Sequence, residues 1–126
     1  MNTFAVSPTP RTPAIYCNLS RGRLDIKGRS SPENTPAFYS PIKQALSSED
    51  NLERLSVRIS LEYFNTSSSK CLYDIFKEIR IKQKSGTDVN VRWYYEEYDE
   101  DMLEAGEDYS DVLDLPFTFV EYCKDL

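Results

Sequence analysis

The apolar residues of this chain recur with two different periods, and the change between them is sharpest around residues 62–70. Before this stretch apolar and polar residues alternate, as in a strand with one buried face; the apolar ones are Leu55, Val57, Ile59, Leu61 and Tyr63. After it, apolar residues follow the i, i+3, i+4, i+7 spacing of a helix with one buried stripe; they are Leu72, Ile75, Phe76 and Ile79. The pattern therefore predicts a strand that passes directly into a helix.

The same patterns predict the remaining elements. Short strands are expected at 14–19 and 23–28, a helix from about residue 36 that Pro41 should kink, a strand at 89–95, a helix over 99–114 and a last strand at 117–122. Right-handed crossovers make the last three strands parallel, and alternating strands indicate one polar face. We expect an α/β fold in the order ββαβαβαβ, with a mixed sheet of about five strands and helices mainly on one face.

Length and composition narrow the class of protein. The 126 residues suit one domain, which we place at 13–126 behind a flexible N-terminal tail at 1–12 that contains Pro8 and Pro10. The three cysteines are far apart and form no zinc motif, and histidine is absent, which excludes His-dependent catalysis. No signal peptide or membrane span is evident, so we expect a cytoplasmic protein. We also expect it to bind no cofactor and no metal.

The net charge of −6 is concentrated in one segment. Ten of the 21 acidic residues lie between Glu96 and Asp114, which contains no lysine or arginine. Such an acidic face disfavours nucleic acid as a partner and is most simply a solvated helix face. It could also dock a basic partner. The contact candidates are Tyr94, which strand alternation leaves exposed, and Glu100, Glu104 and Glu107.

The strand-to-helix junction is rich in hydroxyl groups. A helix N-terminus has unpaired N–H groups and a partial positive charge, so it favours an anion such as phosphate, and Thr66 falls at that position. Helix capping explains one polar side chain there but not five; the five are Asn65, Thr66, Ser67, Ser68 and Ser69. Cys71 lies beside the same helix end, where its pKa could be lowered, although packing is the simpler role.

Four motifs, in order, resemble the SiaC family of bacterial regulatory phosphoproteins, which is similar in fold to the STAS domain of anti-sigma factor antagonists. The motifs are Gly28–Asn34, Leu61–Lys70, Trp93–Tyr95 and Asp99–Glu107. The resemblance implies that a dedicated Ser/Thr kinase phosphorylates Thr66 and that a PPM-type phosphatase removes the phosphate. It further implies that the unphosphorylated form binds and activates an output protein such as a diguanylate cyclase, raising cyclic di-GMP and promoting biofilm. Asn65, Ser67, Ser68, Ser69 and Lys70 then form the environment of the phosphorylation site.

Two other functions fit the residues without the resemblance. The acidic residues of the last helix could make the chain a small metal-binding or ligand-binding domain, although their spacing is that of a helix and no calcium-loop glycine is present. Alternatively, the chain could be a structural interaction module in which residues 65–69 only cap a helix.

Overall fold

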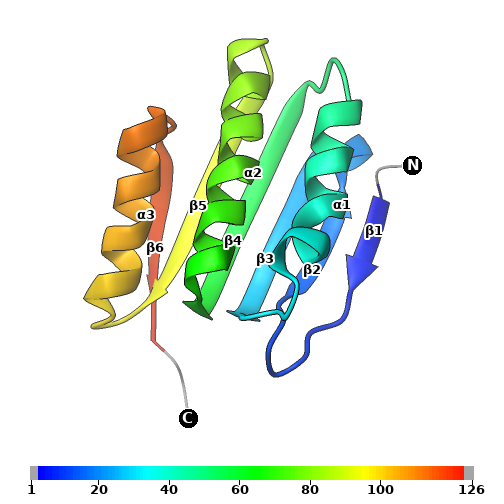
Figure 1. The fold of residues 1–126 in the computed structure, drawn as a ribbon. Coiled ribbons are helices and arrows are strands. Elements are labelled where there is room, and N and C mark those ends of the chain that lie inside the picture. The colour runs from blue at the N-terminus through cyan, green and yellow to red at the C-terminus, as the bar shows by residue number, and fades with distance from the viewer. Residues whose placement is uncertain (1–2, 124–126) are drawn as a thin grey trace.

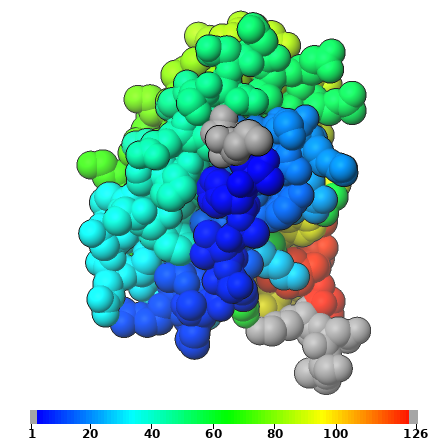
Figure 2. Space-filling model, turned by 90° about the vertical axis from the view of Figure 1, so that its right-hand side faces the viewer, coloured from blue at the N-terminus to red at the C-terminus, as the bar shows by residue number. Residues whose placement is uncertain are grey.

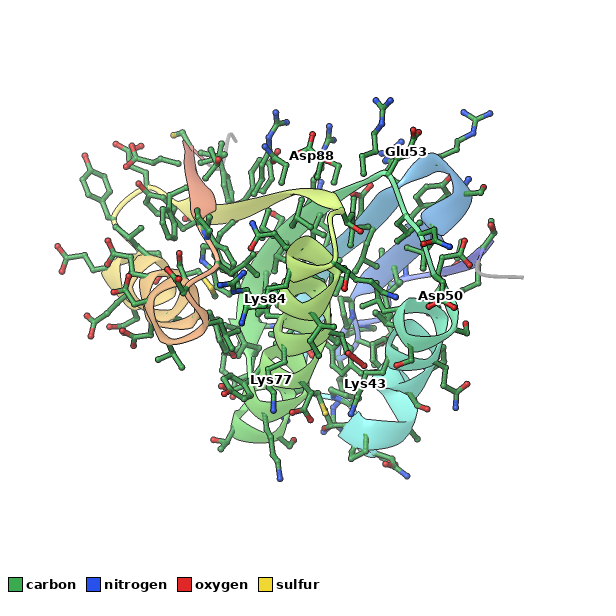
Figure 3. The ribbon with its side chains drawn as sticks, turned by 90° about the horizontal axis from the view of Figure 1, so that it is seen from above. Lys43, Asp50, Glu53, Lys77, Lys84 and Asp88 are labelled. Carbon is green, nitrogen blue, oxygen red and sulfur yellow. The ribbon has the colours of Figure 1, made fainter. Side chains whose placement is uncertain are left out.

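The computed structural model describes residues 3–123 as one six-stranded sheet with three helices on one face (Figure 1; Figure 3). The strands are β1 (Thr3–Val6), β2 (Ala14–Asn18), β3 (Arg23–Ser30), β4 (Arg54–Phe64), β5 (Asp88–Glu96) and β6 (Phe117–Tyr122). They lie in chain order across the sheet. β1, β2 and β3 pair antiparallel, and β3 to β6 pair parallel.

The helices are α1 (Thr35–Ser48), α2 (Thr66–Lys84) and α3 (Glu100–Leu113), with a short 3-10 turn, η1, at Leu19–Arg21. Each long helix begins with a side-chain cap, from Asn34, Asn65 and Asp99 respectively. Pro41 lies inside α1, which nevertheless continues as one helix to Ser48. No helix in the described part of the chain is long and apolar enough to cross a membrane.

The predicted α/β fold class is confirmed, but the sheet has six strands where about five were expected. The additional strand is β1, which lies in the segment predicted to be a flexible tail. Phe4 and Val6 pair with Cys17 and Ile15 of β2 and pack partly buried against the core. This apolar contact orders a segment whose neighbouring prolines suggested disorder. Figure 2, turned so that the β1 side of the molecule faces the viewer, shows this segment on the surface near the middle of that face.

A β-bulge changes which residues of β4 face the core. The pairing with β3 shifts so that Gly28 lies opposite Leu61 but Arg29 lies opposite Tyr63. Tyr63, expected on the buried face, is therefore 45% exposed, with the Arg29 guanidinium over its ring. Phe64 turns inward in its place and packs edge-on against Trp93.

The parallel part of the sheet determines where the helices begin. Since β3, β4 and β5 run in one direction and each is followed by a helix, the three helix N-termini lie at the same edge of the sheet (Figure 1). In open α/β sheets, ligands are commonly bound outside the carboxyl ends of the strands. The hydroxyl-rich junction of β4 and α2 lies there.

Candidate functional site at the start of helix α2

Asn65 is the cap of α2. Its side-chain oxygen accepts a hydrogen bond from the Ser68 backbone N–H at 2.9 Å, and its own N–H donates to the Ser30 carbonyl at 3.0 Å. Asn65 thus caps the helix with its side chain and joins it to the neighbouring strand β3 through its backbone N–H. The other hydroxyl groups of the junction are not needed for capping.

The Ser68 hydroxyl is fully buried and joins α2 to β3. It donates to the Ser30 carbonyl at 3.1 Å and lies 2.8 Å from the Ser30 hydroxyl, which in turn lies 2.5 Å from the Tyr39 hydroxyl of α1. Because Ser68 uses its only proton on the carbonyl, it accepts from Ser30, and Ser30 accepts from Tyr39. Burial raises the pKa of Tyr39 to about 12, so this chain of hydroxyls stays protonated at neutral pH.

The hydroxyls on either side of Ser68 join α2 to the other helices. The Ser67 hydroxyl lies 2.8 Å from that of Thr35 in α1. The Ser69 hydroxyl lies 3.0 Å from that of Tyr109 in α3, which also donates to the Ser69 carbonyl at 2.8 Å. The first turn of α2 is therefore fastened to β3, α1 and α3 by three consecutive serines.

Thr66 differs from its neighbours. Its side chain is exposed, and within residues 3–123 its hydroxyl makes no side-chain hydrogen bond. The backbone N–H groups of Thr66 and Ser67 lie in the first helical turn, where no preceding carbonyl is placed to accept them. The exposed hydroxyl thus lies next to free donors and the positive end of the helix dipole.

Two other side chains of this turn were considered from the sequence. Lys70 lies one turn beyond Thr66, with an exposed side chain that can approach an anion held at the helix end. Cys71 is buried, and burial raises the pKa of its thiol above the ordinary value, with the charge of Asp74 adding to the effect. The suggestion that the helix end lowers the pKa of Cys71 is therefore wrong. The simpler interpretation, that Cys71 packs in the core, is confirmed.

The predicted partner-contact residues lie on two separate surfaces. Glu100, Glu104 and Glu107 are all exposed on α3, on the helix-covered side. Tyr94 lies on the opposite, open face of the sheet and is partly buried. A single flat contact cannot include both sets. Among the described residues, no group of three acids or cysteines is arranged to hold a metal ion.

The outer face of α3 is not entirely acidic. Val112, an apolar residue of α3, is 70% exposed at the rim of a groove between α2 and α3. This groove has a volume of about 280 Å³ and is also lined by Ser69, Tyr73 and Ala105. Since Ser69 lies three residues after Thr66, one end of the groove is at the first turn of α2.

The supporting residues of the site were not found from the sequence. Ser30, Thr35 and Tyr109 each contact one of the α2 hydroxyls, and Tyr39 contacts the Ser30 hydroxyl, yet these residues come from three different elements. The available signal was Ser30, a polar residue four positions after the buried Ile26 and therefore on the same, inward face of the strand. A buried hydroxyl at such a position needs a partner from a packed helix.

Comparison with known proteins places this site in context. The family model described as SiaC family regulatory phosphoprotein matches residues 6–122. The chain is 29% identical over 119 residues to an uncharacterized protein of Pseudomonas aeruginosa strain UCBPP-PA14, covering 93% of this chain and 94% of that protein.

Solved structures of SiaC from the same organism are similar along almost their whole length. One is the complex of the diguanylate cyclase SiaD with its activator SiaC, in which the matched chain is 28% identical with a TM-score of 0.83, covering 94% of this chain and 99% of that one. Another is apo-SiaC, 27% identical with a TM-score of 0.80, covering 95% and 99%.

Proposed function

The chain belongs to the SiaC family of regulatory phosphoproteins, and from this premise we propose that it is a signalling switch controlled by phosphorylation of Thr66. A Ser/Thr protein kinase adds the phosphate and a PPM-type phosphatase removes it. The unphosphorylated form binds and activates an output protein, a diguanylate cyclase, in the cytoplasm. The chain itself catalyses no reaction in this scheme.

The observation that carries the proposal is the contrast between Thr66 and the three serines that follow it. Ser67, Ser68 and Ser69 each hydrogen-bond to another element, whereas Thr66 is exposed and its hydroxyl makes no side-chain hydrogen bond within residues 3–123. A kinase must reach the acceptor hydroxyl without breaking the fold, and Thr66 is the hydroxyl of this turn that meets the condition. The structural alternative, in which residues 65–69 only cap the helix, leaves the exposed threonine without a role.

The same geometry explains how a phosphate would act. Phosphorylation adds about −1.5 to −2 charges, which the free N–H groups of the first turn and Lys70 can stabilise in place. A partner that covers this helix end would then bury a dianion. Without matching cations, that burial costs several kcal/mol, enough to abolish a complex of micromolar affinity.

The output partner is proposed from the relatives. SiaC of Pseudomonas aeruginosa is described as the activator of the diguanylate cyclase SiaD and is found in complex with it. For this chain we propose an equivalent contact that covers Thr66 and extends into the groove beside Val112. The acidic face of α3, with Glu104 at its centre, favours a partner with basic residues at that position.

Phosphorylation of Thr66 can be tested with the cognate kinase and ATP. Mass spectrometry of the wild-type chain should locate one phosphate on Thr66. The Thr66→Ala chain should accept none, and Ser67→Ala, which removes the next hydroxyl, should be phosphorylated as the wild type is. Stoichiometric phosphorylation of Thr66→Ala would contradict the assignment.

The gating step needs a separate measurement. The proposed output diguanylate cyclase should bind the wild type and Thr66→Ala with equal affinity, and Thr66→Glu at least tenfold more weakly. A Thr66→Gln chain, which matches glutamate in size without its charge, separates charge from bulk. Equal binding of all four chains would refute the gate.

A further inference from the structure

Strand β6 forms the edge of the sheet opposite β1 (Figure 1). The Tyr122 carbonyl accepts a hydrogen bond from the N–H of Glu97, the residue that follows β5, so the backbone groups of Tyr122 point toward β5. The Phe117 N–H instead donates to the Ser110 hydroxyl of α3 and points away from β5. The direction of the backbone groups alternates along a strand, so every second residue of β6 points its groups outward from the sheet.

The residues that point outward between these two ends are Phe119 and Glu121. Among residues 3–123, β6 pairs only with β5, and no other hydrogen bond reaches the backbone N–H or C=O groups of Phe119 or Glu121. Two donors and two acceptors are therefore free along this edge, in the spacing that an added strand would match.

The two edges of the sheet differ in how they are protected. Proteins commonly protect a free edge with a very short strand, with proline or with lysine. β1 has four residues, and Pro8 and Pro10 follow it closely. β6 has six residues and contains no proline and no basic residue. β6 is thus the edge to which another strand can add.

The surroundings of the β6 edge are acidic. Glu121 accepts a hydrogen bond from the Tyr95 hydroxyl at 3.5 Å. Burial raises the pKa of Tyr95, and the negative charges of Glu121 and Glu107 raise it further, so Glu107 of α3 lies near the same hydroxyl. A hydrogen bond to Glu97 raises the pKa of the Cys123 thiol, and the charges of neighbouring glutamates add to the effect. None of these three glutamates forms an ion pair within the described residues.

Helix α3 directs Glu107 toward the edge. Ser110 binds the outward N–H of Phe117, so this side of α3 lies at the edge of β6. Glu107 lies three residues before Ser110, which places it on the same side of the helix. Every second side chain of a strand added beside β6 would therefore point toward Glu107 and Glu121.

We propose that the β6 edge binds an extended segment of a partner protein in which lysine or arginine occupies every second position. The segment adds a seventh strand to the six-stranded sheet, and its backbone pairs with Phe119 and Glu121. Its basic side chains face Glu107 and Glu121, and the side chains between them lie beside Val120 on the open face. The β6 strand of a second copy fits poorly, because it would bring an identical set of acidic groups against the first.

This surface is separate from the proposed switch. Thr66 lies at the start of α2, between α1 and α3 in the helix layer, and the groove beside Val112 lies between α2 and α3 (Figure 1; Figure 3). The β6 edge is in the sheet layer, at the end of the sheet where α3 packs. A charge placed at Thr66 should therefore leave binding at β6 unchanged.

The test uses the full chain and a short peptide in which lysine and valine alternate, with both ends blocked. Calorimetric titration should show saturable binding with a Kd below about 1 mM. Two control peptides should each bind at least tenfold more weakly, one with glutamate in place of lysine and one with its central backbone N–H groups methylated. The first control tests the charge, and the second tests the pairing of the backbones.

Hydrogen exchange followed by NMR locates the contact. At saturating lysine peptide, exchange of the outward amides of Phe119 and Glu121 should slow at least tenfold. The amides of Val120 and Tyr122, which point toward β5, should change less than twofold. This alternation is the result of strand pairing, and attraction between unpaired charges does not produce it.

Variants of Glu121 separate charge from pairing. Glu121→Gln removes only the charge and should weaken binding of the lysine peptide at least threefold. Glu121→Pro also removes an N–H that the sheet does not use, and should weaken binding at least tenfold further. Glu53→Gln makes the same charge change at the opposite end of the parallel strands and should alter affinity less than twofold (Figure 3). Thr66→Glu should bind the peptide as the wild type does, and Trp93 fluorescence should show that each variant is folded.

Four results would each overturn the proposal. The first is absent saturable binding at millimolar lysine peptide, and the second is equal binding of the lysine and glutamate peptides. The third is protection that does not alternate along β6. The fourth is protection of the Phe119 and Glu121 amides in the chain without peptide, together with a dimeric mass in solution, which would mean that a second copy occupies the edge.

Discussion

Replacing Ser68 by alanine should separate the structural hydroxyls of the α2 junction from the proposed phosphorylation site. Ser68 is 0% exposed, and its hydroxyl makes two hydrogen bonds, to the carbonyl and the hydroxyl of Ser30. The loss is moderated because the Ser30 carbonyl still accepts from the Asn65 N–H and the Ser30 hydroxyl still contacts Tyr39. Each lost hydrogen bond contributes about 0.5–1.5 kcal/mol, so Ser68→Ala should lower the free energy of unfolding by about 1–3 kcal/mol.

Thr66→Ala should behave differently. The Thr66 side chain is exposed and makes no side-chain hydrogen bond within the described residues, so the change should fall within about 0.5 kcal/mol of the wild type. Ser69→Ala provides a second structural comparison, because it removes the hydroxyl contact with Tyr109 in α3. We expect Ser69→Ala to lie between the other two.

Urea unfolding at neutral pH, followed by fluorescence, measures these differences directly. The chain has one tryptophan, Trp93, which is 0% exposed and contacts α3 through its indole N–H, so its emission reports loss of the core. Equal stability of Ser68→Ala and Thr66→Ala would refute the division of roles. So would a loss of more than 1 kcal/mol in Thr66→Ala, since that would mean that Thr66 is itself part of the structural network.

Three further results are expected. Gly106→Ala should destabilise the fold by roughly 1–2 kcal/mol in the same assay, because the new Cβ would lie 2.6 Å from the Trp93 ring, a clash that outweighs the helix propensity gained. Burial raises the pKa of Tyr39 from 10.0 to about 12, so above pH 10 this phenol ionises in the unfolded chain before it does in the folded one. The free energy of unfolding should therefore fall by up to about 2–3 kcal/mol between pH 10 and 12. This part of the fall should be absent in Tyr39→Phe. Phosphorylation of Thr66 should shift backbone amide NMR signals mainly within residues 65–70, and shifts throughout α1 and α3 would contradict a local effect.

The sequence predicted the elements of this fold more reliably than their details. Periodicity located all three helices and five strands, because each buries one face against the rest of the chain. It missed β1, where only Phe4 and Val6 contact the core and nearby prolines dominate the local composition. It also misassigned Tyr63, since a β-bulge depends on the neighbouring strand and leaves no period of its own.

The details of the site were also beyond what the sequence could predict. Composition indicated that five polar residues at one helix end were too many for a cap, but it could not assign a role to each. The roles of the three serines depend on partners that lie 32 to 40 residues away in the chain. These partners are Thr35, Ser30 and Tyr109, and only the packing of the elements brings them to the junction. Thr66 itself came from the family resemblance, and its exposed position in the structure adds a physical reason for that choice.

The hydrogen bonds that hold the first turn of α2 in place also determine what kind of switch Thr66 can provide. Ser67, Ser68 and Ser69 hold the first turn of α2 against α1, β3 and α3, so moving it would break several hydrogen bonds at once. An added phosphate can instead be accommodated by free N–H groups already present at the helix end. The proposed switch therefore changes the charge of a rigid surface instead of its shape. A partner that covers this turn would detect phosphorylation through the cost of burying the dianion, and the scaffold would need no second conformation.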